Sequence, residues 1–444
     1  MSSPESVGTS STTVTKAARR ASIAGFAGTV VEYYDYSLYV YLAVFFAGAF
    51  FPASDPTAST LAALAVFGSG YIARPIGAVV FGRIGDRVGR RTALMITVVL
   101  MGAASLLLGL LPTYAAIGIA APIILVLLRL IQGFCAGGEQ MGALTLVVES
   151  SSARRRGILA SLTPAGSNIG FASATGVVGF TTFVLGTETM ADWGWRLPFL
   201  LCLPLTLICL FLRMRLEDSP EFTRLKSSER ITKTPVRDLV GSHRKGLLTM
   251  TGLSFSLAGS AYVGLTVGVT YLRETQGFST SVASTISALA IAVSAVLVMP
   301  LAGILVDRIG RRTVCLCGMV AMAVLAYPLF LLMGAAGSVV VVFLAYFLLM
   351  AISSVQTVSG YLISAASFPP AVRYTGTALA FNVGTILGGA FAPFISAQLT
   401  AWTGLSSAPA FWIVGAGLVG LVAVLLAEPA AGHDTPADAG TATN

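Results

Sequence analysis

The sequence predicts an all-α membrane protein with twelve transmembrane helices in two pseudo-symmetric six-helix halves. Three observations predict this fold: an apolar composition, twelve long apolar segments, and a charged motif that occurs twice. Hydrophobic residues make up 55% of the 444 residues and charged residues only 10%, whereas soluble domains carry about 25% charged residues. So few charges cannot cover a globular surface, so most of the surface must face lipid. A soluble enzyme, a disordered chain and a disulfide scaffold are excluded.

Twelve apolar segments are long enough to cross a bilayer, which takes about 20 residues of helix. The first six are expected at 21–48, 59–81, 92–111, 116–147, 157–184 and 194–214. The other six are expected at 246–272, 281–305, 313–334, 338–365, 374–402 and 408–427. Several segments are longer than a bilayer requires, so tilted or kinked helices are expected.

Basic residues lie between alternate helices. Of the 27 Lys and Arg residues, 23 lie before the first helix or near the ends of the even-numbered ones, with Arg213 counted in the loop after the sixth. Cytoplasmic loops carry an excess of Lys and Arg, so we expect a multi-pass cell-membrane protein with both termini in the cytoplasm. A net charge of +8 would suggest nucleic acid in a soluble protein. Here the placement favours orientation signals, and no nucleic-acid partner is expected.

A charged motif occurs once in each half. The sequence GRIGDRVGRR at 82–91 returns as GILVDRIGRR at 303–312, each time after the second helix of a half. Parallel repeats of this kind are typical of a transporter that binds its substrate at the membrane midplane between the halves. The expected divisions are a disordered cytoplasmic segment (1–18), a six-helix bundle (19–215), a cytoplasmic loop (216–245), a second bundle (246–427) and a cytoplasmic tail (428–444).

The repeated loop resembles the signature of the major facilitator superfamily, and so does Arg129-Leu-Ile-Gln132-Gly133 in the fourth helix. More narrowly, the first half resembles the metabolite:proton symporters, which include carriers for 2-oxoglutarate, citrate, shikimate, and proline or betaine. The segments that carry this resemblance are EYYDY (32–36), ARPIGAVVFG (73–82), LPTYAAIGIAAPIILVLLRLIQGF (111–134), GGE (137–139), WGWRLPF (193–199) and EDSPEF (217–222). The sequence departs from that family at Gln140 and Met141, where members usually carry an aromatic residue and a glycine.

The resemblance implies a secondary active transporter, a bacterial monomer that takes up a small organic carboxylate or a zwitterion together with protons by alternating access. A proton-coupled drug or metabolite exporter of the same fold is the alternative. A channel or a membrane enzyme is disfavoured, since no selectivity filter, nucleophile motif or phosphate loop is readable. No metal site and no cofactor are expected.

Charged residues inside membrane helices are costly and indicate function. Glu32 and Asp35 share a face of the first helix, and two neighbouring carboxylates in a low dielectric favour protonation of one of them. Arg129 and Glu139 lie in the fourth helix. We predict proton coupling for these four residues. The alternative is that they form structural ion pairs.

Arg74, in the second helix, is predicted to hold a substrate carboxylate through the two N–H groups of its guanidinium. Its alternative is pairing with Asp35 or Glu32. Other polar residues in the predicted helices are candidates for substrate hydrogen bonds, with ordinary interhelical hydrogen bonds as the alternative. They are Tyr39, Gln132, Asn168, Tyr262, Gln356 and Asn382.

The repeated loops predict a cytoplasmic gate. Each aspartate is expected to cap the N-terminus of a neighbouring helix, where a carboxylate is favoured, and the arginines are expected to close a salt-bridge latch. The alternative is a role in topology alone. The predicted gate residues are Gly82, Asp86, Arg87, Arg90, Asp307, Arg308 and Arg311.

Overall fold

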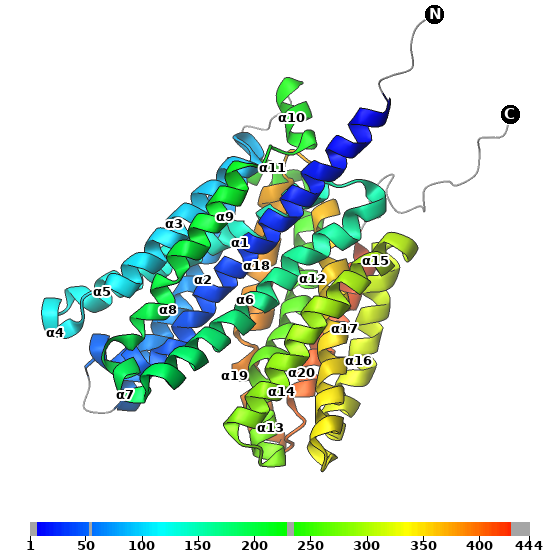
Figure 1. Cartoon of the computed structure of the whole chain (residues 1–444). Coiled ribbons are helices and arrows are strands. Elements are labelled where there is room, and N and C mark those ends of the chain that lie inside the picture. The colour runs from blue at the N-terminus through cyan, green and yellow to red at the C-terminus, as the bar shows by residue number, and fades with distance from the viewer. Residues whose placement is uncertain (1–6, 53–55, 229–234, 428–444) are drawn as a thin grey trace, which may run out of the picture.

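The computed structural model describes residues 7–52, 56–228 and 235–427, and these residues form helices joined by short connections. The helices make two bundles that stand side by side, one from the first half of the chain and one from the second (Figure 1). Each bundle has six membrane-length spans, which confirms the predicted fold class.

The first bundle contains five continuous spans and one broken one. The continuous spans are α1 (Val7–Phe50), α2 (Pro56–Arg87), α3 (Arg90–Leu110), α5 (Ala120–Ser150) and α6 (Arg156–Leu185). The sixth span consists of α8 (Arg196–Leu200) and α9 (Cys202–Met214), and two short helices, α4 (Tyr114–Ile117) and α7 (Thr187–Thr189), lie in connections. Gly118 adopts φ 58° between α4 and α5, so the single helix predicted over 116–147 is interrupted there.

The second bundle has three spans that each contain a π-helical turn. These are α12 (Arg244–Tyr262) with α13 (Gly268–Gln276), α14 (Thr280–Val293) with α15 (Met299–Ile309), and α18 (Arg373–Thr385) with α19 (Ala392–Thr403). Their π-turns are Val263–Val267, Ser294–Val298 and Ile386–Ala390. The other spans are α16 (Arg311–Ala335), α17 (Val339–Ala366) and α20 (Pro409–Leu426), and the loop between the bundles holds α10 (Pro220–Ser227) and α11 (Pro235–Ser242).

Ten helices of the described residues are long and apolar enough to cross a membrane, and the bent pair α12–α13 makes an eleventh. Helix α1 is the twelfth span, and its hydropathy is lowered by Glu32, Asp35 and the tyrosines around them. It begins at Val7, inside the segment 1–18 predicted to be disordered. No proline interrupts the chain from Val7 to Phe50, so the helix can propagate backward from its packed part. Residues 1–6 and the predicted tail at 428–444 lie outside the described residues.

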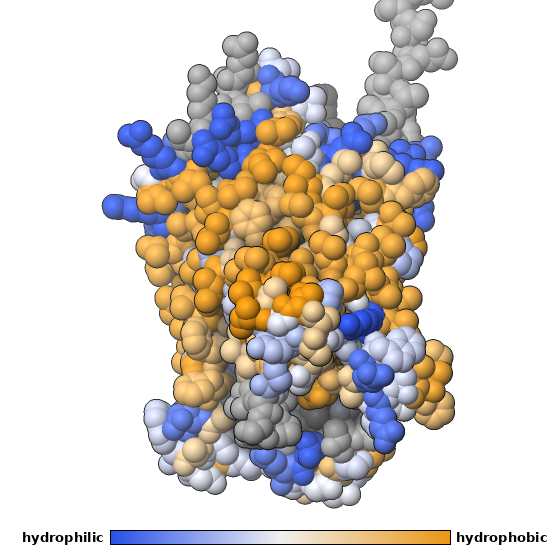
Figure 2. All heavy atoms as spheres, turned by 90° about the vertical axis from the view of Figure 1, so that its left-hand side faces the viewer, coloured by the Kyte–Doolittle hydropathy of each residue, from blue (hydrophilic) through white to orange (hydrophobic). Residues whose placement is uncertain are grey.

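Helix α1 begins and α20 ends on the same side of the molecule, which we call the terminal side (Figure 1, top). The two repeated loops turn there, and Gly89 and Gly310 adopt φ 138° and 89°. Such values are accessible to glycine and rarely to other residues, which explains why both copies of the motif carry glycine at this point. Figure 2 shows a hydrophobic belt between two ends that carry hydrophilic residues.

Candidate functional site

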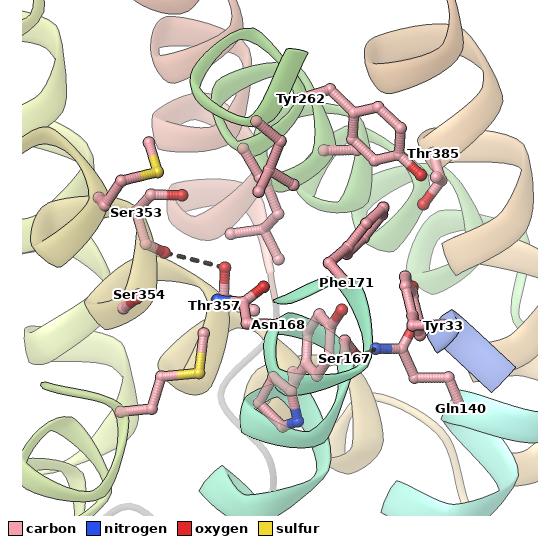
Figure 3. Close-up of a pocket in the computed structure, with 18 of the residues that line it drawn as sticks. Tyr33, Gln140, Ser167, Asn168, Phe171, Tyr262, Ser353, Ser354, Thr357 and Thr385 are labelled. Carbon is pink, nitrogen blue, oxygen red and sulfur yellow. Dashed lines mark hydrogen bonds between the residues drawn. The ribbon is translucent and has the colours of Figure 1, made fainter. Parts of the chain in front are cut away.

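A pocket of about 80 Å³ lies between the two bundles. Figure 3 shows side chains of both halves around it, with Tyr33 and Gln140 on one side and Ser353 and Ser354 on the other. The first half contributes residues of α1, α5 and α6, and the second half residues of α12, α15, α17 and α18 and of the π-turn after α12. The lining residues are Tyr33, Gln140, Pro164, Ser167, Asn168, Phe171, Leu257, Ala258, Ala261, Tyr262, Leu265, Met299, Met350, Ser353, Ser354, Thr357, Tyr361, Phe381 and Thr385.

The pocket wall combines aliphatic and aromatic side chains with neutral polar ones, and the lining residues described carry no formal charge. Tyr33 donates a hydrogen bond to Gln140 (2.8 Å), and Gln140 donates to Ser167 (2.8 Å). This chain of contacts links α1, α5 and α6. Gln140 thus sits in the pocket at the position where the sequence departs from the symporter family.

Arg74 of α2 does not line the pocket itself, and Tyr71 lies between it and the lining residue Tyr262. The hydroxyl of Tyr262, a lining residue, is 3.0 Å from the hydroxyl of Tyr71. The guanidinium of Arg74 lies 4.8 Å from the centre of the Tyr71 ring and 4.4 Å from that of Tyr36. Arg74 is 1% exposed, and its Nε and Nη2 make no hydrogen bond within the described residues. A buried guanidinium with free N–H groups is suited to bind an anionic group.

A second polar cluster surrounds Asp35 inside the first half. The side-chain amide nitrogen of Gln132 donates to both carboxylate oxygens of Asp35, at 3.0 and 2.8 Å. The amide oxygen of Gln132 accepts from Arg129 at 2.9 Å. Gln132 therefore stands between Arg129 and Asp35. The expected alternative of an ion pair between Arg129 and a helix-1 carboxylate is not among the ion pairs of the described residues.

Glu139 makes a third cluster with a residue whose role the sequence did not reveal. Arg213 of α9 pairs with both carboxylate oxygens of Glu139, and Thr97 of α3 donates to the same carboxylate at 2.6 Å. Arg213 is 1% exposed and pairs inside the bundle, although the sequence placed it only among the basic residues around the loop after the sixth helix. Gly28 of α1 leaves room for this pair, because a Cβ there would lie within 3 Å of both side chains.

Of the remaining predicted substrate and proton-coupling residues, some line the pocket and others lie away from it. Asn168 and Tyr262 line the pocket. Glu32 is buried, and its Oε2 makes no hydrogen bond within the part of the chain described. Three predicted substrate residues instead bond to backbone carbonyls away from the lining: Tyr39 to Ala63, Gln356 to Gly318, and Asn382 to Gly137 across the two halves.

The gate residues form two reciprocal caps on the terminal side. Asp86 of α2 accepts from the backbone N–H groups of Tyr374 and Thr375 at the start of α18, at 3.2 and 2.9 Å. Asp307 of α15 accepts from those of Gly157 and Ile158 at the start of α6, at 2.6 and 3.1 Å. The repeated motif predicted a cap on a neighbouring helix, and the structure shows that each half caps a helix of the other.

One predicted pair of gate residues is present, since Arg90 lies 3.4 Å from Asp86, but the further ion pairs around the caps include acidic residues that were not predicted. Arg90 pairs with Glu149 at the end of α5 (3.1 Å), and Arg373 pairs with Glu149 (3.1 Å) and with Glu221 of α10. Arg87 and Arg308 lie exposed on the surface. Gly82 faces Thr375, whose Cα would lie 2.6 Å from a Cβ at position 82. The sequence signal that was missed is the acidic end of α5, together with the EDSPEF segment that supplies Glu221.

Comparisons with known proteins agree with this arrangement. A family model described as "Sugar (and other) transporter" matches residues 21–242, and one described as "Major Facilitator Superfamily" matches residues 249–443. The proline/betaine transporter of Salmonella typhimurium is 34% identical over 419 residues, which cover 91% of this chain and 82% of that protein. The shikimate transporter of Escherichia coli strain K12 is 34% identical over 92% of this chain and 94% of its own length.

Solved structures show the same fold. The proton:xylose symporter XylE aligns with a TM-score of 0.73 at 20% identity, over 93% of this chain and 95% of its own. The Escherichia coli fucose:proton symporter FucP aligns with a TM-score of 0.69 at 13% identity, over 93% and 98%. The two-bundle fold, the inter-bundle pocket and these relatives together establish that the chain belongs to the major facilitator superfamily of membrane transporters.

Proposed function

We propose that this transporter takes up a small carboxylate or zwitterionic metabolite together with protons by alternating access. The observation that carries the proposal is the juxtaposition of an inter-bundle pocket with carboxylates buried in one bundle. Glu32 and Asp35 are 2% and 1% exposed and lie on α1, which also supplies Tyr33 to the pocket wall. Arg129 would act as their counter-charge. Glu139 would be an inner proton site whose pair with Arg213 has to open.

The pocket chemistry favours a net-neutral zwitterion over an anion. A charged ligand without a counter-charge is costly to bury, and the lining residues described are uncharged. Aromatic faces such as those of Phe171, Tyr262 and Phe381 suit a substituted ammonium group, while Arg74 behind Tyr71 would attract a carboxylate. The names of the relatives fit this range, since one is a proline/betaine transporter and another a shikimate transporter.

The terminal side would face the cytoplasm, as the basic loops indicate. The caps by Asp86 and Asp307 join the halves on that side, so the conformation described would be closed toward the cytoplasm. Uptake then requires both caps to release. The bundles 19–215 and 246–427 would rock against each other as two bodies of a monomer.

Transport assays in proteoliposomes test the proposal. Purified protein is exposed to an imposed inward proton gradient, with radiolabelled glycine betaine, proline, shikimate, citrate and 2-oxoglutarate offered one at a time. We expect accumulation of glycine betaine or proline that collapses with a protonophore. Accumulation that is unchanged by the protonophore would contradict proton coupling. Outward flux driven by the proton gradient would favour the alternative, a proton-coupled exporter.

A further inference from the structure

Gln132 was predicted to contact substrate, but its surroundings place it elsewhere. Its side chain is buried and is hydrogen-bonded to residues of α1, α3 and α5 in the first half. It is not among the residues that line the pocket. We propose that Gln132 is a positioning residue that holds Asp35 ionised and separates it from Arg129 until Asp35 takes up a proton. This inference rests on the proposed role of Asp35 as a proton carrier.

The contacts leave one orientation for the amide. Its oxygen must accept from Arg129, because guanidinium groups only donate hydrogen bonds. Its nitrogen therefore faces Asp35, where it is 3.0 and 2.8 Å from the two oxygens. The nitrogen is also 3.0 Å from the hydroxyl oxygen of Ser105, and that hydroxyl donates to the carbonyl of Met101. Ser105 is thus an acceptor for Gln132, which fixes the amide from a third helix.

This arrangement responds to the protonation of Asp35. An ionised carboxylate accepts hydrogen bonds at both oxygens, whereas a protonated one has become a donor at one of them. The amide nitrogen of Gln132 cannot accept a hydrogen bond from the protonated oxygen, so one of its two contacts with Asp35 is lost when Asp35 is protonated. The amide is then held by fewer hydrogen bonds, so its oxygen fixes Arg129 less firmly.

Arg129 is prepared for such a release. It is fully buried, its guanidinium lies 4.2 Å from the Tyr39 ring centre and 4.9 Å from that of Tyr36, and its Nε and Nη2 make no hydrogen bond to the residues described. The hydrogen bond to Gln132 is therefore its main polar tether. Through this bond, protonation of Asp35 on α1 affects the Arg129 guanidinium on α5.

Other titratable groups lie around Asp35 or next to its neighbour on α1. Cys202 of α9 places its sulfur 3.7 Å from an oxygen of Asp35. Arg74 of α2 lies against Tyr36, the residue after Asp35. The ionisable and charged groups around the carboxylate are Glu32 and Tyr34 on α1, Arg129 and Cys135 on α5, and Cys202 on α9, while α3 contributes the hydroxyl of Ser105.

The test measures protonation directly and needs no substrate. The full-length protein in lipid vesicles is titrated while infrared difference spectroscopy follows the carbonyl band of protonated carboxyl groups. The part of the band lost in Asp35→Asn belongs to Asp35. In Gln132→Met, which keeps the length and removes the amide, we expect that part to reach half intensity at a pH higher by about one unit, a tenfold gain in proton affinity, because hydrogen bonds to the ionised form are lost.

The matched control is Gln276→Met in α13, whose amide donates to the carbonyl of Gly334 at 2.6 Å in the other half. It should leave the Asp35 band in place. If Gln132→Met does not fold, Gln132→Asn replaces it, because its shorter amide cannot reach both Arg129 and Asp35. An Asp35 band that titrates at the same pH in the folded Gln132 variant overturns the inference alone. A spectrum in which Asp35→Asn removes no band overturns the role of Asp35 and the inference with it.

Discussion

The hydroxyl of Tyr374 donates a hydrogen bond to the backbone carbonyl of Gly138 across the two halves, at 2.8 Å. Tyr374 lies in the first turn of α18 and is fully buried. Its ring occupies space against α2 and α5 that is open only because Gly85 and Gly142 have no side chain: a Cβ at either position would lie 1.9 Å from a Tyr374 atom. A side chain of the second half thus fills a glycine-lined socket of the first.

Filling that socket should open the terminal side. In Gly85→Ala the new methyl group would overlap the Tyr374 ring, so the closed arrangement loses stability relative to one in which α18 has withdrawn. Spin labels at Arg83 of α2 and Ile309 of α15, with the exposed Cys317 replaced by Ser, report the distance between the halves there. We expect the population of long distances to grow.

The control for this experiment is Gly68→Ala in the same helix, where a Cβ would meet nothing within 4 Å. It should leave the distance distribution unchanged. Equal distributions in the two alanine variants would show that the socket does not govern closure.

Replacing Asp35 by Asn should abolish proton-driven accumulation while sparing substrate exchange, because Asn accepts Gln132 at one atom but cannot bind a proton. Accumulation under a proton gradient and counterflow without one are measured in the same proteoliposomes. Asp192→Asn, at an exposed site of the same half, serves as the control. Parent-like accumulation by Asp35→Asn would remove Asp35 from proton coupling.

Replacing Arg74 by Lys should weaken binding of a substrate carboxylate by about tenfold, since Lys lacks the planar fork that stacks between Tyr36 and Tyr71 and binds an anion through two N–H groups. The apparent KM for the transported compound is the measurement. The maximal rate should fall less than the affinity. An unchanged KM would place Arg74 outside the substrate site.

Arg213→Met should destabilise the protein by about 3–5 kcal/mol, because it leaves Glu139 buried beside α3 without its counter-charge. Thermal unfolding in detergent measures the loss. Arg215→Met, two residues further on at an exposed position, should have little effect. The double change Glu139→Met with Arg213→Met should recover part of the stability, since no uncompensated charge remains, and a double variant no more stable than Arg213→Met would contradict this account.

Much of the fold could be predicted from the sequence because each membrane span is a long run of apolar residues. The motif copies at Asp86 and Asp307 also predicted helix caps, since a carboxylate is favoured at a helix N-terminus, but that each half caps a helix of the other is known only from the structure. The residues that line the pocket were harder to predict. Gln132, Gln356 and Asn382 are polar residues in apolar helices, and the direction in which each points depends on how its helix is rotated about its own axis. A single sequence does not determine that rotation.

Arg213 shows the same difficulty at a helix end. Counted along the chain it belongs with the basic residues of the central loop, and Arg215 beside it is exposed. What distinguishes the two is Glu139, 74 positions earlier in the sequence and adjacent in space. A distant partner of this kind leaves no local signal. The departure at Gln140 was visible in the sequence, but its position in the pocket wall became clear only from the structure.

The π-turns give the two halves different mechanical properties. A π-turn inserts an extra residue into a helix and weakens the regular backbone ladder at that point, so a helix bends there more readily than elsewhere. The membrane-spanning π-turns of the described residues all lie in the second half, at Val263–Val267, Ser294–Val298 and Ile386–Ala390. The buried charges of the first half lie in the continuous helices α1, α2, α3 and α5, except for Arg213 in α9. We therefore expect deformation during transport to be concentrated in α13, α14 and α19, which lie at the end of the second half farthest from the caps (Figure 1).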